Sequence, residues 1–317
     1  MFGVDIKPSV HLDPEKLAKL DEQQIYLLFS ENNWEKIDKV SRLAVLQEVE
    51  NRRARLDRRP PIPVLEGSRE EFENPASLGY YNDNDRIIRI NYRYLEGKSP
   101  YHTPYGALDV VVHEGRHAMQ SDVIREHPDR VAMQILNEWR SSKACYFSPN
   151  DMEDPDDSDN MMGMIKMAIY AMQSIEIDAR RTARNALLEV SKAFEVNGLD
   201  DRGVAAQLIS NLQEEYNIIL LVQHTLTLEK LDELEKLVLA AMHDRFPEVD
   251  TSKLRVFDHA RLILKAPDIE TLENPIDLIA FLDQFEQGKM DLIKDKLSLE
   301  MKEETLDRVA SIRLNKM

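Results

Sequence analysis

The stretch that decides the fold of this chain is Val110-Val111-Val112-His113-Glu114-Gly115-Arg116-His117-Ala118-Met119-Gln120. We expect it to form the middle of a helix. His113 and His117 are four residues apart, so their imidazoles lie one above the other on a single helix face. Two neutral imidazoles at this spacing can share one Zn²⁺, and Glu114 is placed to take a proton from a metal-bound water. The alternative is a buried helix that happens to carry two histidines.

The composition describes a large acidic protein. Its 317 residues are enough to bury a substantial core, as one large domain or two. The formal net charge is −17, so we expect neither a nucleic-acid backbone nor an anionic membrane surface as a partner. Solubility alone accounts for a charge of this sign and size.

Cysteine usage and the N-terminal segment bear on the compartment. Cys145 is the single cysteine, so no intrachain disulfide can form, which suits a reducing compartment. Residues 1–21 carry charge and proline without the apolar segment of a secretory signal, and no apolar run is long enough to span a bilayer. We therefore expect a cytoplasmic protein, while delivery as an effector or toxin would leave no plain mark in the sequence.

Residues 1–60 are predicted to form a helical N-terminal region. Asp13-Pro14 has the pattern of an N-cap followed by proline at the first helical position. Apolar residues from Trp34 to Val49 recur at helical spacing. The arginines between Arg52 and Arg59 are predicted to form a solvated helix end, where positive charge is favourable. The prolines of residues 60–63 then end the region.

Residues 61–198 are predicted to form the catalytic core. The only convincing β signal lies at residues 78–92, where β-rich segments flank the polar turn at residues 82–85 and predict a hairpin. The edge of such a hairpin can hold a substrate peptide by strand addition. Thr103-Pro104 predicts the start of the helix that carries the two histidines, which should end near Glu126.

Helices are predicted for most of the remaining chain. We expect one at residues 128–145 and another at residues 161–196, which Asn197-Gly198 ends. Between them, residues 148–160 are rich in aspartate and proline and favour a solvated loop over a calcium site, because an EF-hand's glycine and final glutamate are absent. Residues 199–317 are predicted to be a helical C-terminal region.

A catalytic zinc needs a third protein ligand and a fourth position for water. The third histidine of the metzincin pattern is excluded, because Gln120 and Val123 occupy the two positions that the pattern requires. Glu138, 21 residues after His117, would suit a thermolysin-like arrangement. Glu176 follows His117 by 59 residues, with Asp178 close to it. Since residues at i and i+2 point apart on a helix, one of these two would be a ligand and the other would support the site from outside.

Five motifs fall within residues 75–185, a little over a third of the chain. They are Gly79-Tyr80, Ile88-x-Ile90-Asn91, Val112-His113-Glu114-x-Arg116-His117-Ala118-x-Gln120, Asn137-Glu138-Trp139 and Tyr170-x-x-Gln173-x-Ile175-Glu176-Ile177-Asp178-Ala179. Together they resemble a family of bacterial zincin-type metallopeptidase domains, which occur alone and as the tips of secreted polymorphic toxins. The resemblance implies a zincin-like core in which Glu176 is the third ligand and Glu138 is only a neighbour of the core residue Trp139.

Three features depart from the family pattern. Ser174 stands where relatives usually have proline, and Arg180 follows Asp178-Ala179 where they usually have an aromatic residue. The acidic segment at residues 148–160 also lengthens the gap between the motifs. These departures bear on the position of Glu176 and leave a catalytically weakened member as an alternative.

The sequence as a whole predicts a mainly α fold with a small β-hairpin, in which a zincin-like core carries additional helices. We expect a gluzincin-like zinc metallopeptidase acting on a protein or peptide, with His113, His117 and Glu176 as ligands and Glu114 as general base. The alternatives are a non-catalytic helical binding or scaffold protein that retains the zinc site, and another zinc hydrolase. Candidate donors to the oxyanion are Tyr105 and Arg116, and beside them Tyr80, Tyr81, Tyr101 and His102.

Overall fold

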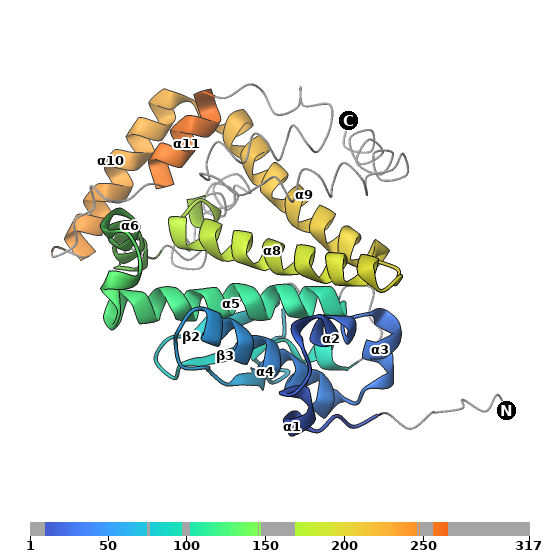
Figure 1. Cartoon of the computed structure of the whole chain (residues 1–317). Helices are drawn as coiled ribbons and strands as arrows, with labels where there is room; N and C mark the ends of the chain where they lie inside the picture. The colour runs from blue at the N-terminus through green and yellow to red at the C-terminus, as the bar shows by residue number, and fades with distance from the viewer. Residues whose placement is uncertain are drawn as a thin grey trace. The chain divides into compact units, whose positions relative to one another are not determined.

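The computed structural model describes residues 10–74, 77–96, 102–144, 146, 169–245, 247 and 256–265 (Figure 1). The chain divides into two compact units. Unit 1 consists of Met1–Lys143 and Ser174–Asn211, and unit 2 of Ala144–Gln173 and Leu212–Met317. This division differs from the three segments expected, because the N-terminal helix Lys39–Leu56 packs on the helix that carries the two histidines, and both belong to the same unit.

Four helices open unit 1: α1 (Pro14–Leu17), α2 (Glu22–Leu27), α3 (Glu31–Lys36) and α4 (Lys39–Leu56). The Asp13 side chain caps α1, and Pro14 follows it, as the sequence predicts. The apolar repeat from Trp34 to Val49 is divided between two helices, because the chain becomes extended at Ile37 and Asp38 caps α4. Asp38 accepts a hydrogen bond from the Ser41 backbone at 2.7 Å, which lets a new helix begin within the repeat.

A three-stranded sheet packs on α5 (Pro104–Arg125). Its strands β1 (Val64–Glu66), β2 (Gly79–Asn82) and β3 (Ile87–Ile90) lie in the order β1-β3-β2. β2 and β3 form the expected antiparallel hairpin, with Arg86 at φ 53° in its turn. β1 pairs in parallel with β3 and was not predicted, since three residues are too few to show an alternating pattern.

Helix α5 is the central element of unit 1 and confirms the prediction of a helix from residue 104. The Thr103 hydroxyl accepts a hydrogen bond from the Gly106 backbone at 3.0 Å and caps it. The 3-10 turn η2 (Pro128–Arg130) and helix α6 (Met133–Ala144) follow, so the second helix starts later than expected. The residues that join α5, α6 and the next helix are Met119, Val123, Leu136, Trp139 and Ile175, which form one apolar cluster.

Helix α8 (Ser174–Val196) runs along α5, and these two helices pack together (Figure 1). Gly198, with φ +64°, follows it in the left-handed conformation that ends helices, as predicted. The expected helix at residues 161–196 is interrupted, because a turn at Met172 and Gln173 separates helical residues 169–171 from α8. Residues 161–168 and the acidic segment 148–160 lie outside the described residues.

Unit 2 is helical where it is described. It contains the second half of α9 (Arg202–Thr225), with α10 (Leu228–Arg245) and α11 (Val256–Lys265), which pack on each other. Its apolar core includes Val222, Leu231 and Phe257. Among the described helices of the chain, none combines the length and the apolar character that a membrane span requires.

The solvated patch that the sequence predicts at the end of α4 is confirmed only in part: Arg55 and Arg58 are exposed, whereas Arg53 and Arg59 have partners inside the protein. Arg59 has 1% of its side chain exposed and pairs with Glu50, which is equally buried. Arg59 also donates a hydrogen bond to the backbone carbonyl of Gly115, at 3.0 Å. Arg53 pairs with Glu189 on α8. Arg59 thus connects the end of α4 to α5, and Arg53 connects α4 to α8. The local sequence pattern does not reveal these distant partners.

Candidate metal centre

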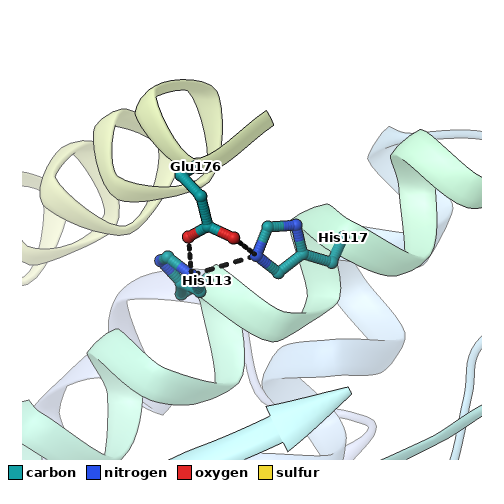
Figure 2. Close-up of side chains that lie close together, drawn as sticks. All are labelled: His113, His117 and Glu176. Carbon is teal, nitrogen blue, oxygen red and sulfur yellow. Dashed lines mark hydrogen bonds and ion pairs between the residues drawn. The ribbon is translucent and has the colours of Figure 1, made fainter. Parts of the chain in front are cut away.

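Two helices bring together the three residues of the predicted metal site. His113 and His117 lie one turn apart on α5, and Glu176 points toward them from the first turn of α8 (Figure 2). The two Nε2 atoms are 3.1 Å apart. Glu176 Oε2 lies 3.4 Å from Nε2 of His113, and Oε1 lies 3.4 Å from Nε2 of His117. Three potential ligands thus converge on one point.

The spacing of these atoms fits one tetrahedral metal ion. Bonds of about 2.0–2.2 Å from zinc to nitrogen or oxygen put the corners of a tetrahedron about 3.3–3.6 Å apart. The two Nε2 atoms are 3.1 Å apart, and each is 3.4 Å from one of the two oxygens of Glu176, so each separation is close to that value. The donor set of two imidazoles and one carboxylate is also one that zinc accepts in catalytic sites. His113, His117 and Glu176 therefore fit a zinc ion without rearrangement of the two helices.

Burial differs among the three ligands. The side chain of Glu176 is 1% exposed, whereas those of His113 and His117 are 18% and 16% exposed. The ligand from α8 is thus enclosed, and the imidazoles border the solvent.

The charges at the site favour a cation. Burial by itself raises the pKa of Glu176, but His117 and His113 outweigh it and hold that pKa well below its usual range. Burial lowers the pKa of His117, but the carboxylate of Glu176 outweighs it and raises the pKa to about 9. Glu176 also lies in the first turn of α8, where the helix dipole stabilises negative charge. The buried, ionised carboxylate of Glu176 therefore faces both imidazoles.

Glu114 lies beside this site and is held by the sheet. The backbone N–H of Tyr81, in β2, donates a hydrogen bond to Glu114 Oε2 at 2.8 Å. Glu114 also lies three residues before His117 on α5, so the two side chains are neighbours on the helix surface. A carboxylate fixed next to the imidazoles can accept and return a proton there.

Asp178 and Arg116 bind each other, although the sequence left both open to other roles. The Nε and a terminal nitrogen of Arg116 donate to the two carboxylate oxygens of Asp178, at 2.7 and 3.0 Å. Asp178 also accepts a hydrogen bond from Gln120 at 2.8 Å. Asp178 is therefore bonded to Arg116 and Gln120 and is not part of the group formed by His113, His117 and Glu176. Arg116 is engaged with it, so its guanidinium is not a free donor for an oxyanion.

The other predicted residues are not part of the group formed by His113, His117 and Glu176. Tyr105 is buried and packs edge-on against Phe194, so the structure does not support it as an oxyanion donor. Glu138, on α6, belongs to neither group of potential metal ligands found among the described residues. The hydroxyls of Tyr80 and Tyr81 bond to Glu71 and Asp83, His102 is buried with its ring against Tyr94, and Tyr101 lies outside the described residues.

A second group of potential ligands lies at the end of α5 and consists of Asp122, Glu126 and His127. Arg130 binds Asp122 at 2.9 Å, and Arg86 lies 3.4 Å from a carboxylate oxygen of Glu126. Two guanidinium groups thus compensate the two carboxylates. We interpret this group as an ion-pair network that secures the end of α5.

Sequence reasoning missed three parts of the site: the backbone of Tyr81, the buried pair Glu50–Arg59 behind Gly115, and Gln120. The spacing of Gln120, three residues after His117 on the same helix, was a signal that could have identified it as a neighbour of the imidazole. In comparisons with known proteins, no family model, curated protein or solved structure matches the chain. The resemblance to zincin-type domains therefore stays a prediction.

Proposed function

We propose that this protein is a zinc-dependent metallopeptidase that uses His113, His117 and Glu176 as metal ligands and Glu114 as general base. The observation that carries the proposal is the convergence of these three ligands: the two Nε2 atoms are 3.1 Å apart, and each lies 3.4 Å from a different carboxylate oxygen of Glu176. Glu114 adds to it, because a carboxylate next to a two-histidine, one-carboxylate site is what hydrolysis by metal-activated water requires.

Zinc in this site would supply a Lewis acid that polarises a carbonyl and lowers the pKa of water toward neutrality. The chain itself supplies the proton transfers. Glu114 takes a proton from the attacking water and delivers it to the nitrogen of the leaving amine. The N–H of Tyr81 holds one carboxylate oxygen of Glu114, which leaves the other oxygen to carry that proton.

The position of β2 supports an extended peptide as substrate. Asn91 donates a backbone hydrogen bond to Leu78, and bonded pairs alternate along an antiparallel ladder. Gly79 and Tyr81 therefore turn their backbone groups away from β3, toward the side where Glu114 lies. Because Tyr81 gives its N–H to Glu114, an extended chain would pair with the remaining backbone groups of this edge, which would bring it to the carboxylate.

A pair of variants tests the proposal. Purified protein is loaded with zinc, its metal content is measured, and cleavage of an unstructured protein such as casein is followed. Glu114→Gln keeps an oxygen that can accept the Tyr81 hydrogen bond but cannot take a proton. We expect this variant to retain zinc and to lose cleavage by about 10²–10⁴-fold. His113→Ala should lose both.

The same measurements separate the alternatives. If the wild type binds zinc and does not cleave, the metal has a structural or binding role, and the scaffold alternative is favoured. If the wild type cleaves an ester or another amide but no peptide, another zinc hydrolase is favoured. If the wild type binds no zinc, the metallopeptidase proposal is rejected.

A further inference from the structure

We infer that Gln120 is a positioning residue that fixes which nitrogen of His117 faces the metal site, by way of a hydrogen-bond relay from Arg116 through Asp178. The inference rests on the proposed function only in taking the ion to be zinc. The relay itself is a property of α5 and α8 and is testable without metal or substrate.

The orientation of the Gln120 amide follows from its partners. Its Nε2 donates to the backbone carbonyl of Ile175 at 3.0 Å and to Oδ2 of Asp178 at 2.8 Å. A carbonyl and an ionised carboxylate can only accept hydrogen bonds, so the NH₂ group must face them. The reversed amide would place an oxygen against two acceptors. Gln120 is 2% exposed, which makes such unsatisfied contacts costly.

The orientation of the amide requires a hydrogen on Nδ1 of His117. Gln120 Oε1 lies 2.9 Å from Nδ1 of His117 and can only accept a hydrogen bond. Nδ1 must therefore carry a hydrogen. Nε2, which faces His113 and Glu176, is then the nitrogen left to bind a metal.

The relay is anchored beyond Gln120. Arg116 grips Asp178 with two hydrogen bonds, of 2.7 and 3.0 Å, and lies over the ring of Trp139 at 5.6 Å. Because the guanidinium bonds to Asp178 and lies over the Trp139 ring, it fixes the carboxylate that accepts a hydrogen bond from Gln120. The carboxylate in turn cannot rotate without breaking three hydrogen bonds.

The relay also ties the two halves of the site together. The acceptors of Gln120 are the backbone of Ile175 and the side chain of Asp178, which flank Glu176 in the sequence. One amide thus orients a histidine from α5 and holds the turn of α8 that carries the carboxylate ligand. A change at Gln120 should therefore affect the metal site more than a change of the same kind elsewhere.

The test uses Gln120→Met, which keeps an unbranched side chain of similar length and removes the relay. Gln47→Met is the matched control. Gln47 also joins its helix to backbone groups, donating to the carbonyl of Ile62 and accepting from the N–H of Val64. Neither of these partners is a proposed metal ligand. Both variants are compared with the wild-type full chain, metal-free and zinc-loaded.

The direct measurement is the ring proton on Nδ1 of His117, observed by NMR in protein labelled with ¹⁵N histidine and assigned by its loss in His117→Ala. We expect a slowly exchanging proton in the metal-free wild type and in Gln47→Met, and none in Gln120→Met. Addition of zinc to the wild type should leave this proton in place, because zinc binds the opposite nitrogen. A purely structural role would not produce this pattern.

The second measurement is zinc affinity, from competition with a chelator. We expect Gln120→Met to bind zinc about 10–100-fold more weakly, as is typical when a group that orients a ligand is removed, and Gln47→Met to match the wild type. The inference is overturned if the proton persists in Gln120→Met, if it is absent from the wild type, if zinc displaces it, or if zinc affinity is unchanged. If the wild type binds no zinc, the proposed function fails, while the metal-free spectra still decide the relay. If Gln120→Met does not fold, the wild-type spectra with and without zinc decide it.

Discussion

Replacing Glu50 with glutamine should destabilise unit 1 strongly, because it removes the carboxylate bonded to the buried Arg59 and leaves that charge only the longer ion pair with Asp57, at 3.6 Å. The side chains of Glu50 and Arg59 are both 1% exposed. Two hydrogen bonds join them, of 2.6 and 2.8 Å, and Glu50 also accepts one from the backbone of Ile62 at 3.0 Å. Removal of one partner of such a pair costs about 3–5 kcal/mol, since the remaining charge cannot reach water.

The consequence for melting follows from the size of the unit. Unit 1 combines Met1–Lys143 with Ser174–Asn211. For a domain of roughly 150–250 residues, each kcal/mol shifts the melting temperature by about 2–4 °C. We therefore expect Glu50→Gln to lower it by roughly 6–20 °C. The measurement is calorimetry of the metal-free protein, with far-ultraviolet circular dichroism to check that the variant is folded at low temperature.

Two controls identify the cause. Glu66→Gln removes a carboxylate whose side chain is 35% exposed and whose partner Lys39 is 44% exposed, so it should cost about 0–1 kcal/mol. The double variant Glu50→Leu with Arg59→Met removes both buried charges and should recover part of the loss. A melting temperature for Glu50→Gln within 2 °C of the Glu66→Gln value, or a double variant no more stable than the single one, would refute the reasoning.

Two further predictions concern the motif helix and its carboxylate partner. Glu176→Ala should weaken zinc binding by more than about 100-fold, which exceeds the usual effect of losing a group that only orients a ligand. Glu138→Ala should leave zinc affinity within about 3-fold of the wild type, since Glu138 is in neither group of potential ligands. Chelator competition measures both affinities, and the reverse order would make Glu138 the ligand. Gly115→Ala should lower the free energy of unfolding by about 1–3 kcal/mol, because the new methyl group would lie 2.8 Å from Glu50 Oε2, which Arg59 holds in place. This loss should exceed the gain of about 1 kcal/mol that alanine brings to a helix. Urea denaturation measures this, and a gain in stability would show that the Glu50 carboxylate can yield.

Elements with local signals were predictable from the sequence. The start of α5 depends on the Thr103 hydroxyl and the proline after it, and the hairpin of β2 and β3 depends on a polar turn of a few residues. Such signals act over one turn of chain, so the sequence displays them directly. The mainly helical composition of the fold followed from the same kind of evidence.

Elements that depend on distant partners were not predictable. β1 is stabilised by its pairing with β3, and its three residues show no periodicity of their own. The buried position of Arg59 depends on Glu50 and on the Gly115 carbonyl, 56 residues further along the chain. The sequence around these residues contains the charges but does not show what lies opposite them.

The sequence by itself determined that His113 and His117 share one face of a helix with Glu114 beside them, because helical periodicity fixes the directions of residues four apart. It could not determine which distant carboxylate meets them. That was decided by the packing of α8 against α5, which brings a carboxylate oxygen of Glu176 to 3.4 Å from each imidazole and places Asp178 in an ion pair with Arg116. The physical reason is that the rotation of one helix against another depends on the apolar and charged contacts along both helices, and no local stretch of sequence contains both sides of those contacts.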